Sequence, residues 1–180
     1  MTRQKSVKPR LSRRIGNFTG DRRALLLLVT IGLLLAGRAW LADHPEHNPW
    51  APLDLRDPVG WATETKLLAL RDDVAECRAV LDRSGIAHDV LEPAGEGACR
   101  REDRIRLNSL PLSPRPPPVT CPASIALLLW ERDVLNSSAM EIFGSKIARI
   151  EHLGAYSCRR LYGRDTGPWS EHATANAIDI

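Results

Sequence analysis

The sequence predicts an α+β protein with flanking helices, a largely antiparallel sheet and one N-terminal transmembrane helix. Three observations support this prediction. Residues 24–42 form an apolar run close to the roughly 20 residues that span a bilayer. Between residues 63 and 84, apolar residues recur at spacings of three and four, as on one face of a helix. Residues 104–108 alternate between polar and apolar, as a half-buried strand does.

Residues 61–180 are predicted to form one domain, because helical and strand segments follow one another there in mixed order. Residues 43–60 contain four prolines and no periodicity, so we expect a linker. The first part of the domain is expected to contain a helix over 63–84 that ends before Gly85, strands over 86–91 and 104–108, and a proline-rich loop over 111–118. A second helix is expected from Pro122 and would bury Ile125, Leu128 and Leu129. A short helix capped by Ser137 or Ser138 and ending near Gly144, and then a strand over 147–153, would complete the domain.

Charge is distributed unevenly along the chain. Residues 1–23 contain eight Lys or Arg and one Asp, whereas the rest of the chain contains 17 basic and 21 acidic residues. The part that follows the basic tail is therefore mildly acidic, while proteins that bind nucleic acid carry basic surfaces. We expect no nucleic-acid partner.

The apolar run of residues 24–42 is predicted to be an uncleaved single-pass signal anchor. Arg38 interrupts the run near its end, where a long basic side chain reaches the membrane interface beside Trp40. The basic tail of residues 1–23 places the N-terminus in the cytoplasm and the domain outside. A cleaved signal peptide is the alternative, although the best cleavage position, near residues 37–39, contains Arg38 and is a poor one.

All four cysteines follow the apolar run, at Cys77, Cys99, Cys121 and Cys158. An even number of cysteines on the exported side predicts two disulfides. Three pairings are possible, and we expect the sequential one, 77–99 with 121–158, because each bridge then closes a short segment. A cysteine zinc site is the alternative, but the sequence contains no C-x-x-C pair.

The last eleven residues hold His172 and Asp179, seven positions apart and separated by small residues and Asn176. In an extended strand, an odd offset would send the two side chains to opposite faces. A turn near Ala175 and Asn176, followed by a strand over 177–180, would bring them together. Histidine and aspartate are ordinary zinc ligands, and two of them supply half of a tetrahedral site. The alternative is a surface histidine and an aspartate at the end of a strand.

The pattern Ser170-x-His172-x-x-Ala175-x-Ala177-x-Asp179 resembles the S-x-H-x-x-G-x-A-x-D signature of the zinc D-Ala-D-Ala carboxypeptidases and their hedgehog-like relatives. Ala175 stands where glycine is usual. The resemblance implies a hedgehog/D-Ala-D-Ala-peptidase-type antiparallel sheet with flanking helices.

The whole segment 170–180 resembles more closely the bacterial extensin-like C-terminal domain family. So do Cys121 and Pro122, which lead into a helix with Trp130, and the segment 150–159. The resemblance extends from about Cys77 to Ile180. For a bacterial protein, the membrane would be the inner membrane and the domain would be periplasmic.

The resemblance implies roles for four residues. His172 and Asp179 would bind zinc, Ser170 would orient a ligand through a hydrogen bond, and Arg159 would bind the carboxylate of a wall peptide. Ser170 as an ordinary turn residue and Arg159 as a solvent-facing residue are the alternatives. No residue is assigned as catalytic. The family continues beyond this point with a strand and a His-x-His segment that supplies the third ligand, so we expect a truncated chain without that ligand.

These observations predict a membrane-anchored, exported extensin-like protein of the bacterial cell envelope. It would resemble zinc-dependent peptidoglycan peptidases, be inactive as a truncated chain, and meet peptidoglycan or envelope peptides. The alternative is a non-catalytic module that binds or supports the cell envelope.

Overall fold

The protein is described by a computed structural model that covers residues 19–180. Most of the predicted basic tail of residues 1–23 lies outside these residues. The chain divides after Asp43 into two units, and each is described by itself. The domain predicted over residues 61–180 is contained in the second unit, which begins at His44.

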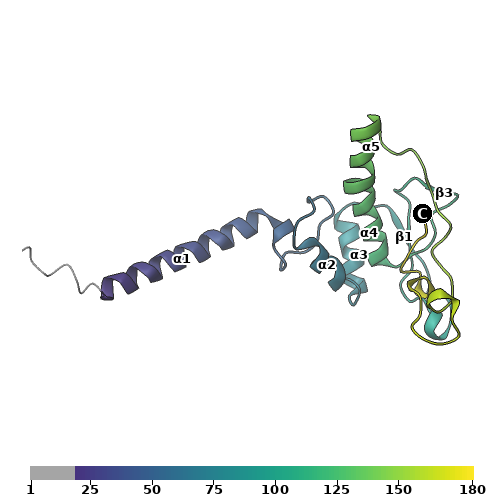
Figure 1. The fold of residues 1–180 in the computed structure, drawn as a ribbon, viewed down its shortest axis with the longest axis horizontal. Helices are drawn as coiled ribbons and strands as arrows, with labels where there is room; N and C mark the ends of the chain where they lie inside the picture. Colours follow the sequence, from purple (N-terminus) through teal and green to yellow (C-terminus); the bar gives the residue numbers. More distant parts are fainter. Residues whose placement is uncertain (1–18) are drawn as a thin grey trace, which may run out of the picture. The chain divides into compact units, whose positions relative to one another are not determined.

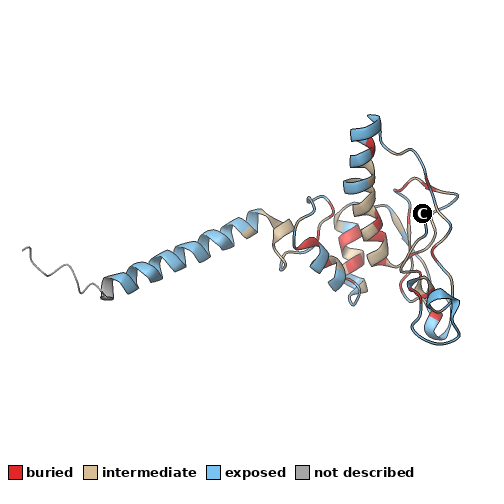
Figure 2. Ribbon diagram, in the orientation of Figure 1, coloured by how far each residue is buried: buried red, intermediate tan, exposed pale blue. Residues whose placement is uncertain are grey.

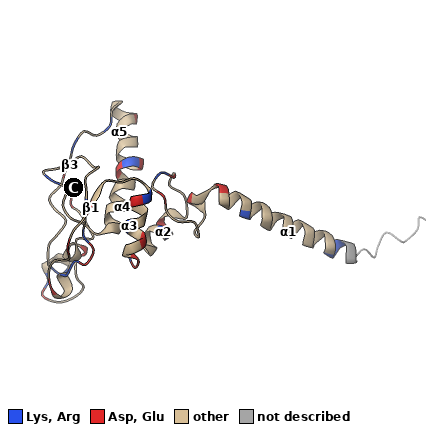
Figure 3. Ribbon diagram, turned by 180° about the vertical axis from the view of Figure 1, so that it is seen from behind, with Lys and Arg blue, Asp and Glu red and all other residues tan. Residues whose placement is uncertain are grey.

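The first unit contains the helix α1 (Thr19–Asp43), which includes the whole predicted span of residues 24–42. Its apolar side chains are exposed (Figure 2), and its charged residues lie near its two ends (Figure 3). Among the described residues it is the one helix that is long and apolar enough to cross a membrane, by length and composition. Such a helix is typical of a membrane span or a signal anchor.

The second unit mixes helices with small sheets, as the α+β prediction required (Figure 1). Its helices and strands are α2 (Thr63–Ala69), α3 (Val74–Arg83), β1 (His88–Val90), β2 (Ile105–Leu107), β3 (Leu112–Ser113), α4 (Cys121–Trp130), α5 (Asn136–Phe143) and β4 (Ile150–Glu151). Short 3₁₀ turns also occur, η1 (Pro45–His47), η2 (Gly97–Cys99), η4 (Leu161–Gly163) and η5 (Glu171–Thr174).

The prediction of one largely antiparallel sheet was wrong. The described residues form two separate pairs of strands: β1 and β2 are antiparallel, with His88 opposite Leu107, and β3 and β4 are parallel, with Leu112 opposite Ile150. The predicted strand over 147–153 is reduced to β4, and β3 lies within the predicted proline-rich loop. Each strand has only two or three residues, which is too short to build a common sheet.

The single helix predicted over 63–84 is two helices, α2 and α3. Asp73 leaves the helical conformation at φ −131°, and its carboxylate accepts a hydrogen bond from the Glu76 amide at 2.9 Å. This N-cap satisfies one of the free amides at the start of α3, so a new helix begins there. The apolar spacing continues across the break, which is why it predicted one helix.

The helix from Pro122 is confirmed as α4, and Ile125 is fully buried in it, whereas Leu128 and Leu129 are only partly buried. The next helix was predicted to have its own serine cap, and this was wrong. α4 continues through a π-helical turn, η3 (Glu131–Leu135), directly into α5, so Ser137 and Ser138 lie inside a helix. The predicted end is confirmed, because Gly144 has the left-handed φ of 67°.

The core of the second unit lies between α3, β2 and α4. Its largest fully buried side chains are Leu81, Ile105, Leu107, Ile125 and Val80. The segment predicted as a linker also contributes to it, since Leu53 and Leu55 are buried in the same cluster. Residues 44–60 are therefore part of the packed domain.

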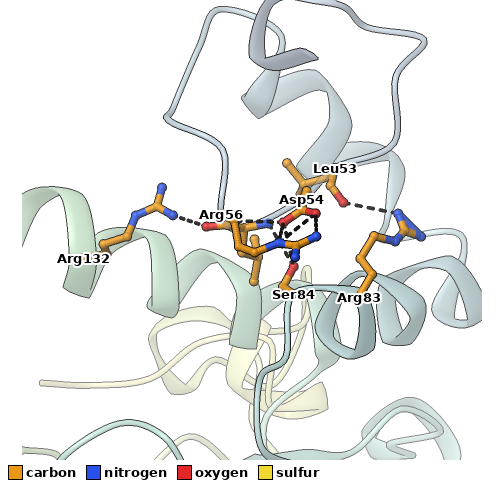
Figure 4. Close-up of polar contacts among 7 residues, drawn as sticks. Leu53, Asp54, Arg56, Arg83, Ser84 and Arg132 are labelled. Atoms are coloured by element: carbon orange, nitrogen blue, oxygen red, sulfur yellow. Dashed lines mark hydrogen bonds and ion pairs between the residues drawn. The ribbon is translucent and has the colours of Figure 1, made fainter. Parts of the chain in front are cut away.

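Backbone groups of this segment bind side chains from two helices (Figure 4). Arg83 of α3 donates to the Leu53 carbonyl at 3.2 Å, and Arg132 donates to the Leu55 carbonyl. The Leu55 amide donates to the Ser84 hydroxyl at 2.9 Å. Since each of these groups would otherwise lose its hydrogen bonds with water on burial, the contacts hold the segment on the domain.

Two disulfides are present, but the sequential pairing was wrong. Cys77 of α3 is bonded to Cys121 at the start of α4, and Cys99 of η2 is bonded to Cys158. Cys77 and Cys121 are both fully buried, with Cα atoms 6.0 Å apart, because α3 and α4 pack against each other in the core. Short loop length was therefore a poor guide to pairing.

Replacing Cys77 and Cys121 together by Ala is expected to lower the free energy of unfolding by about 4 kcal/mol, since the bridge closes a long loop in the unfolded chain. The measurement is urea unfolding of the full chain in detergent, followed by circular dichroism. Replacing Cys99 and Cys158 together by Ser serves as the comparison and should have a similar effect. An unchanged midpoint in both variants would contradict a stabilising role of the two bridges.

The hydrogen bond from Arg56 lowers the pKa of Asp54 from 3.8 to about 2. Because the folded-state pKa is the lower one, this stabilisation is complete above about pH 4 and is lost as the pH falls toward 2. Arg56 is largely exposed, so we expect an effect below about 1 kcal/mol. In Asp54→Asn, the urea concentration at the midpoint of unfolding should fall less between pH 4 and pH 2 than it does in the unmodified chain. Asp72→Asn, at an exposed carboxylate, should leave that decrease as in the unmodified chain; equal slopes in all three chains would contradict the assignment.

Candidate functional site

His172 and Asp179 lie next to each other, with His172 Nε2 3.3 Å from Asp179 Oδ1. The turn η5 carries His172 and ends at Ala175, whose backbone is left-handed with φ 59° and ψ 34°. The predicted turn near residues 175–176 is confirmed. The predicted strand over 177–180 was wrong; in its place, Asp179 forms an isolated antiparallel bridge with Gly154.

The bridge to Gly154 fixes the backbone of Asp179. The Asp179 amide donates to the Gly154 carbonyl at 3.0 Å, and the Leu153 amide donates to the Asp179 carbonyl at 2.9 Å. One more contact holds His172, because the Ser157 amide donates to its carbonyl at 3.0 Å. The backbone of segment 153–157 therefore binds that of both candidate ligands and aligns them.

The imidazole of His172 is oriented by a backbone carbonyl. Its Nδ1 lies 3.1 Å from the Ala155 carbonyl oxygen, and Ala155 is almost fully buried. A carbonyl only accepts, so Nδ1 carries the proton and, in the neutral ring, Nε2 presents a lone pair. This lone pair faces the Asp179 carboxylate, which is also an acceptor. Two acceptors at this distance are stabilised by a proton on Nε2 or by a cation that both bind.

Metal-binding histidines commonly donate the other ring N–H to a backbone carbonyl, as His172 does to Ala155. The His172 side chain is 14% exposed and the Asp179 side chain 59% exposed, so the pair is open to solvent on the aspartate side. Within residues 19–180, however, no three His, Cys, Asp or Glu side chains gather closely enough to hold a metal ion. The orientation of His172 and its distance to Asp179 would allow both side chains to bind one ion, and the zinc site itself stays a prediction.

The other two histidines of this region bind elsewhere. His152 Nε2 lies 3.0 Å from the Arg115 carbonyl oxygen, and His88 Nδ1 lies 2.9 Å from that of Ile86. Neither ring belongs to the His172 site.

Ser170 is buried, and its hydroxyl accepts a hydrogen bond from the His172 amide at 3.3 Å. It therefore caps η5 and orients the backbone of the candidate ligand. The Ser170 amide in turn donates to the Arg159 carbonyl at 3.1 Å. Arg159 itself is exposed, and its role in binding a carboxylate remains a prediction.

A polar network that no sequence pattern predicted also supports the turn after η5 and connects it to the start of α4. Arg71, after α2, forms an ion pair with Glu171 at 3.1 Å, and Asn176 donates to the same carboxylate at 2.5 Å. The Thr120 hydroxyl donates to the Asn176 side-chain oxygen at 2.6 Å. Arg71 and Glu171 are 100 residues apart in the chain, so no local pattern indicates their contact. Glu171 therefore stabilises the turn at Ala175 and Asn176.

The network borders a cavity of about 200 Å³ at the start of α4. Asp103, which is 8% exposed, also lines this cavity. Its carboxylate accepts hydrogen bonds from the Cys121 amide and from Arg78, at 3.2 Å. A carboxylate is favoured there because the helix N-terminus carries free amides and a partial positive charge.

A family model described as "Extensin-like protein C-terminus" matches residues 75–180. The chain belongs to the extensin-like family. The match includes all four cysteines and the segment that carries His172 and Asp179, and it begins close to the predicted position. No curated protein and no solved structure matches the chain. The expected relation to zinc peptidases stays a prediction from the residues of segment 170–179.

Replacing Asn176 by Ala is expected to lower the free energy of unfolding by about 1–2 kcal/mol, because Thr120 and the Glu171 carboxylate both lose a partner. Urea unfolding of the full chain in detergent measures this effect. Thr174→Ala, which removes only a long 3.4 Å contact to the Glu171 carbonyl, is the matched control. It should change the free energy by less than about 0.5 kcal/mol, and equal losses in both variants would contradict a role of the network.

Proposed function

We propose that this extensin-like protein is anchored in the bacterial inner membrane by α1, faces the cell envelope, and has in His172 and Asp179 two ligands of a zinc site like that of envelope peptidases. The observation that carries the proposal is the geometry of the pair, in which Nδ1 is bound to a carbonyl and Nε2 faces a carboxylate. The resemblance of segment 170–179 to hedgehog and D-Ala-D-Ala-peptidase domains supports the same site.

The topology proposed places the N-terminus in the cytoplasm and the domain in the periplasm. The basic residues of the tail support this orientation, since positive charge is enriched on the cytoplasmic side. Two disulfides in the second unit also support it, because such bridges persist in oxidising compartments.

The residues of the site have distinct proposed roles. His172 Nε2 and the Asp179 carboxylate would hold the ion, and Ser170 and Ala155 would keep the imidazole oriented. Zinc held by these two residues and a further ligand would supply Lewis-acid chemistry, which lowers the pKa of a bound water and polarises a peptide carbonyl. Arg159 would bind the carboxylate of a wall peptide, since a planar guanidinium makes two parallel hydrogen bonds to it. Its backbone contact with Ser170 ties it to the turn that carries His172.

A non-catalytic module that binds the envelope is the second candidate. It is favoured by the finding that residues 19–180 bring together no third metal-binding side chain. Such a module would bind wall fragments through side chains such as Arg159 without hydrolysis. Binding would then not require a metal.

The full chain in detergent is expected to bind about one zinc ion, and His172→Ala and Asp179→Ala should each weaken binding at least about tenfold because each removes a ligand. The measurement is equilibrium dialysis against zinc followed by elemental analysis. His152→Ala is the matched control, since that ring binds the Arg115 carbonyl away from the site, and it should leave zinc binding unchanged.

Zinc binding that is equal in the unmodified chain and in His172→Ala would contradict the zinc site. Binding of wall fragments should be measured in parallel, with and without a chelator. Fragment binding that persists both after chelation and in His172→Ala would support the non-catalytic module instead.

A further inference from the structure

A largely apolar groove of about 450 Å³ lies on the second unit, away from the residues of the candidate site. Its apolar lining is formed by Val59, Trp61, Leu67, Leu129 and Val134. Three of its apolar side chains are strongly exposed: Trp61 at 64%, Val59 at 54% and Val134 at 54%. Large exposed apolar side chains gathered around one groove are typical of a binding surface.

The rim of this groove is bound directly to the first residues of the domain. Lys66 Nζ donates to the Pro45 carbonyl at 2.6 Å, and the Ala62 amide donates to the Glu46 carbonyl at 3.3 Å. The Trp61 ring stacks on the His47 ring, with centroids 6.1 Å apart.

Gly60 allows this close approach. A Cβ atom at this position would lie 2.3 Å from the Glu46 carbonyl oxygen, which is closer than real Cβ contacts. The contacts between η1 and residues 60–66 therefore require a glycine at position 60.

The connection between α1 and these contacts is short. Pro45 follows Asp43, the last residue of α1, by two positions, and two extended residues span at most about 7 Å. The headgroup region on each side of a bilayer is about 5–8 Å thick. A chain that leaves the membrane at the end of α1 thus reaches Pro45 within the thickness of the headgroup layer.

We infer that the surface formed by Val59, Trp61, Leu67, Leu129 and Val134, the juxtamembrane surface, contacts the membrane and is covered by lipid headgroups and upper acyl chains. The inference rests on the proposed anchoring by α1. Tryptophan is enriched at membrane interfaces, where an apolar ring with a polar N–H is favoured.

The charges around the groove indicate which lipid it accepts. None of the described residues that line it is Lys or Arg, and Glu64 is exposed there. Asp133 is paired with Arg132 by two contacts of 2.7 Å, so its charge is compensated. A surface without cations gains nothing from anionic lipid, so the partner is a zwitterionic headgroup such as phosphatidylcholine or phosphatidylethanolamine.

The full chain should be reconstituted in phosphatidylcholine vesicles with and without acyl-chain bromine, which quenches nearby tryptophan. Trp40→Phe combined with Trp50→Phe provides the starting variant, because these changes remove the tryptophan of α1 and the exposed Trp50 that lies before the groove residues. In this background, Trp61→Phe is expected to reduce bromine quenching about twofold, since the ring in the headgroup layer is lost. Trp169→Phe is the matched control, at an exposed tryptophan outside the groove, and should not reduce it.

Flotation of the vesicles after an alkaline wash tests the anchor separately. A chain that does not float would overturn both the anchor and the inference. A chain that floats while Trp61→Phe leaves quenching unchanged would overturn the juxtamembrane surface alone and assign the groove to another partner. Quenching of Trp61 that requires anionic lipid and is lost in high salt would equally contradict a zwitterionic contact. Trp61→Phe keeps an aromatic ring at an exposed position, so the variant is expected to fold.

Discussion

Three contacts fix the start of α4, and the candidate site depends on the position of this helix end. Cys121 is bonded to Cys77 in the core, its amide donates to the buried carboxylate of Asp103, and Thr120 binds Asn176. Since the disulfide and the carboxylate fix the helix end against α3, the turn that follows η5 has a rigid support. His172 and Asp179 meet because that turn is held on one side by α4 and on the other by segment 153–157.

The sequence predicted well those features that depend on neighbouring residues. The apolar run of α1, the turn at Ala175 and the end of α5 at Gly144 each follow from local composition or backbone preference. The convergence of His172 and Asp179 was also predicted, because the spacing matched a known signature. Small residues between them permit the tight turn that the structure contains.

What was missed depends on contacts between distant parts of the chain. Loop length suggested the wrong disulfides, because the packing of α3 on α4 decides that Cys77 meets Cys121. The ion pair of Arg71 with Glu171 has no local pattern at all. Leu53 and Leu55 lie in a proline-rich segment, where composition predicts a linker, yet burial in the core and hydrogen bonds from two helices order it. In each case tertiary packing, which no local pattern encodes, decided the outcome.

The two disulfides interleave along the chain, since Cys99 lies between Cys77 and Cys121, and Cys121 lies between Cys99 and Cys158. Every peptide bond from Cys77 to Cys158 is therefore enclosed by at least one bridge. A single protease cut anywhere in this stretch, including its exposed loops, would leave both fragments covalently joined. After a cut within residues 77–158, the fragment that carries His172 would therefore stay attached to the fragment that continues from α1.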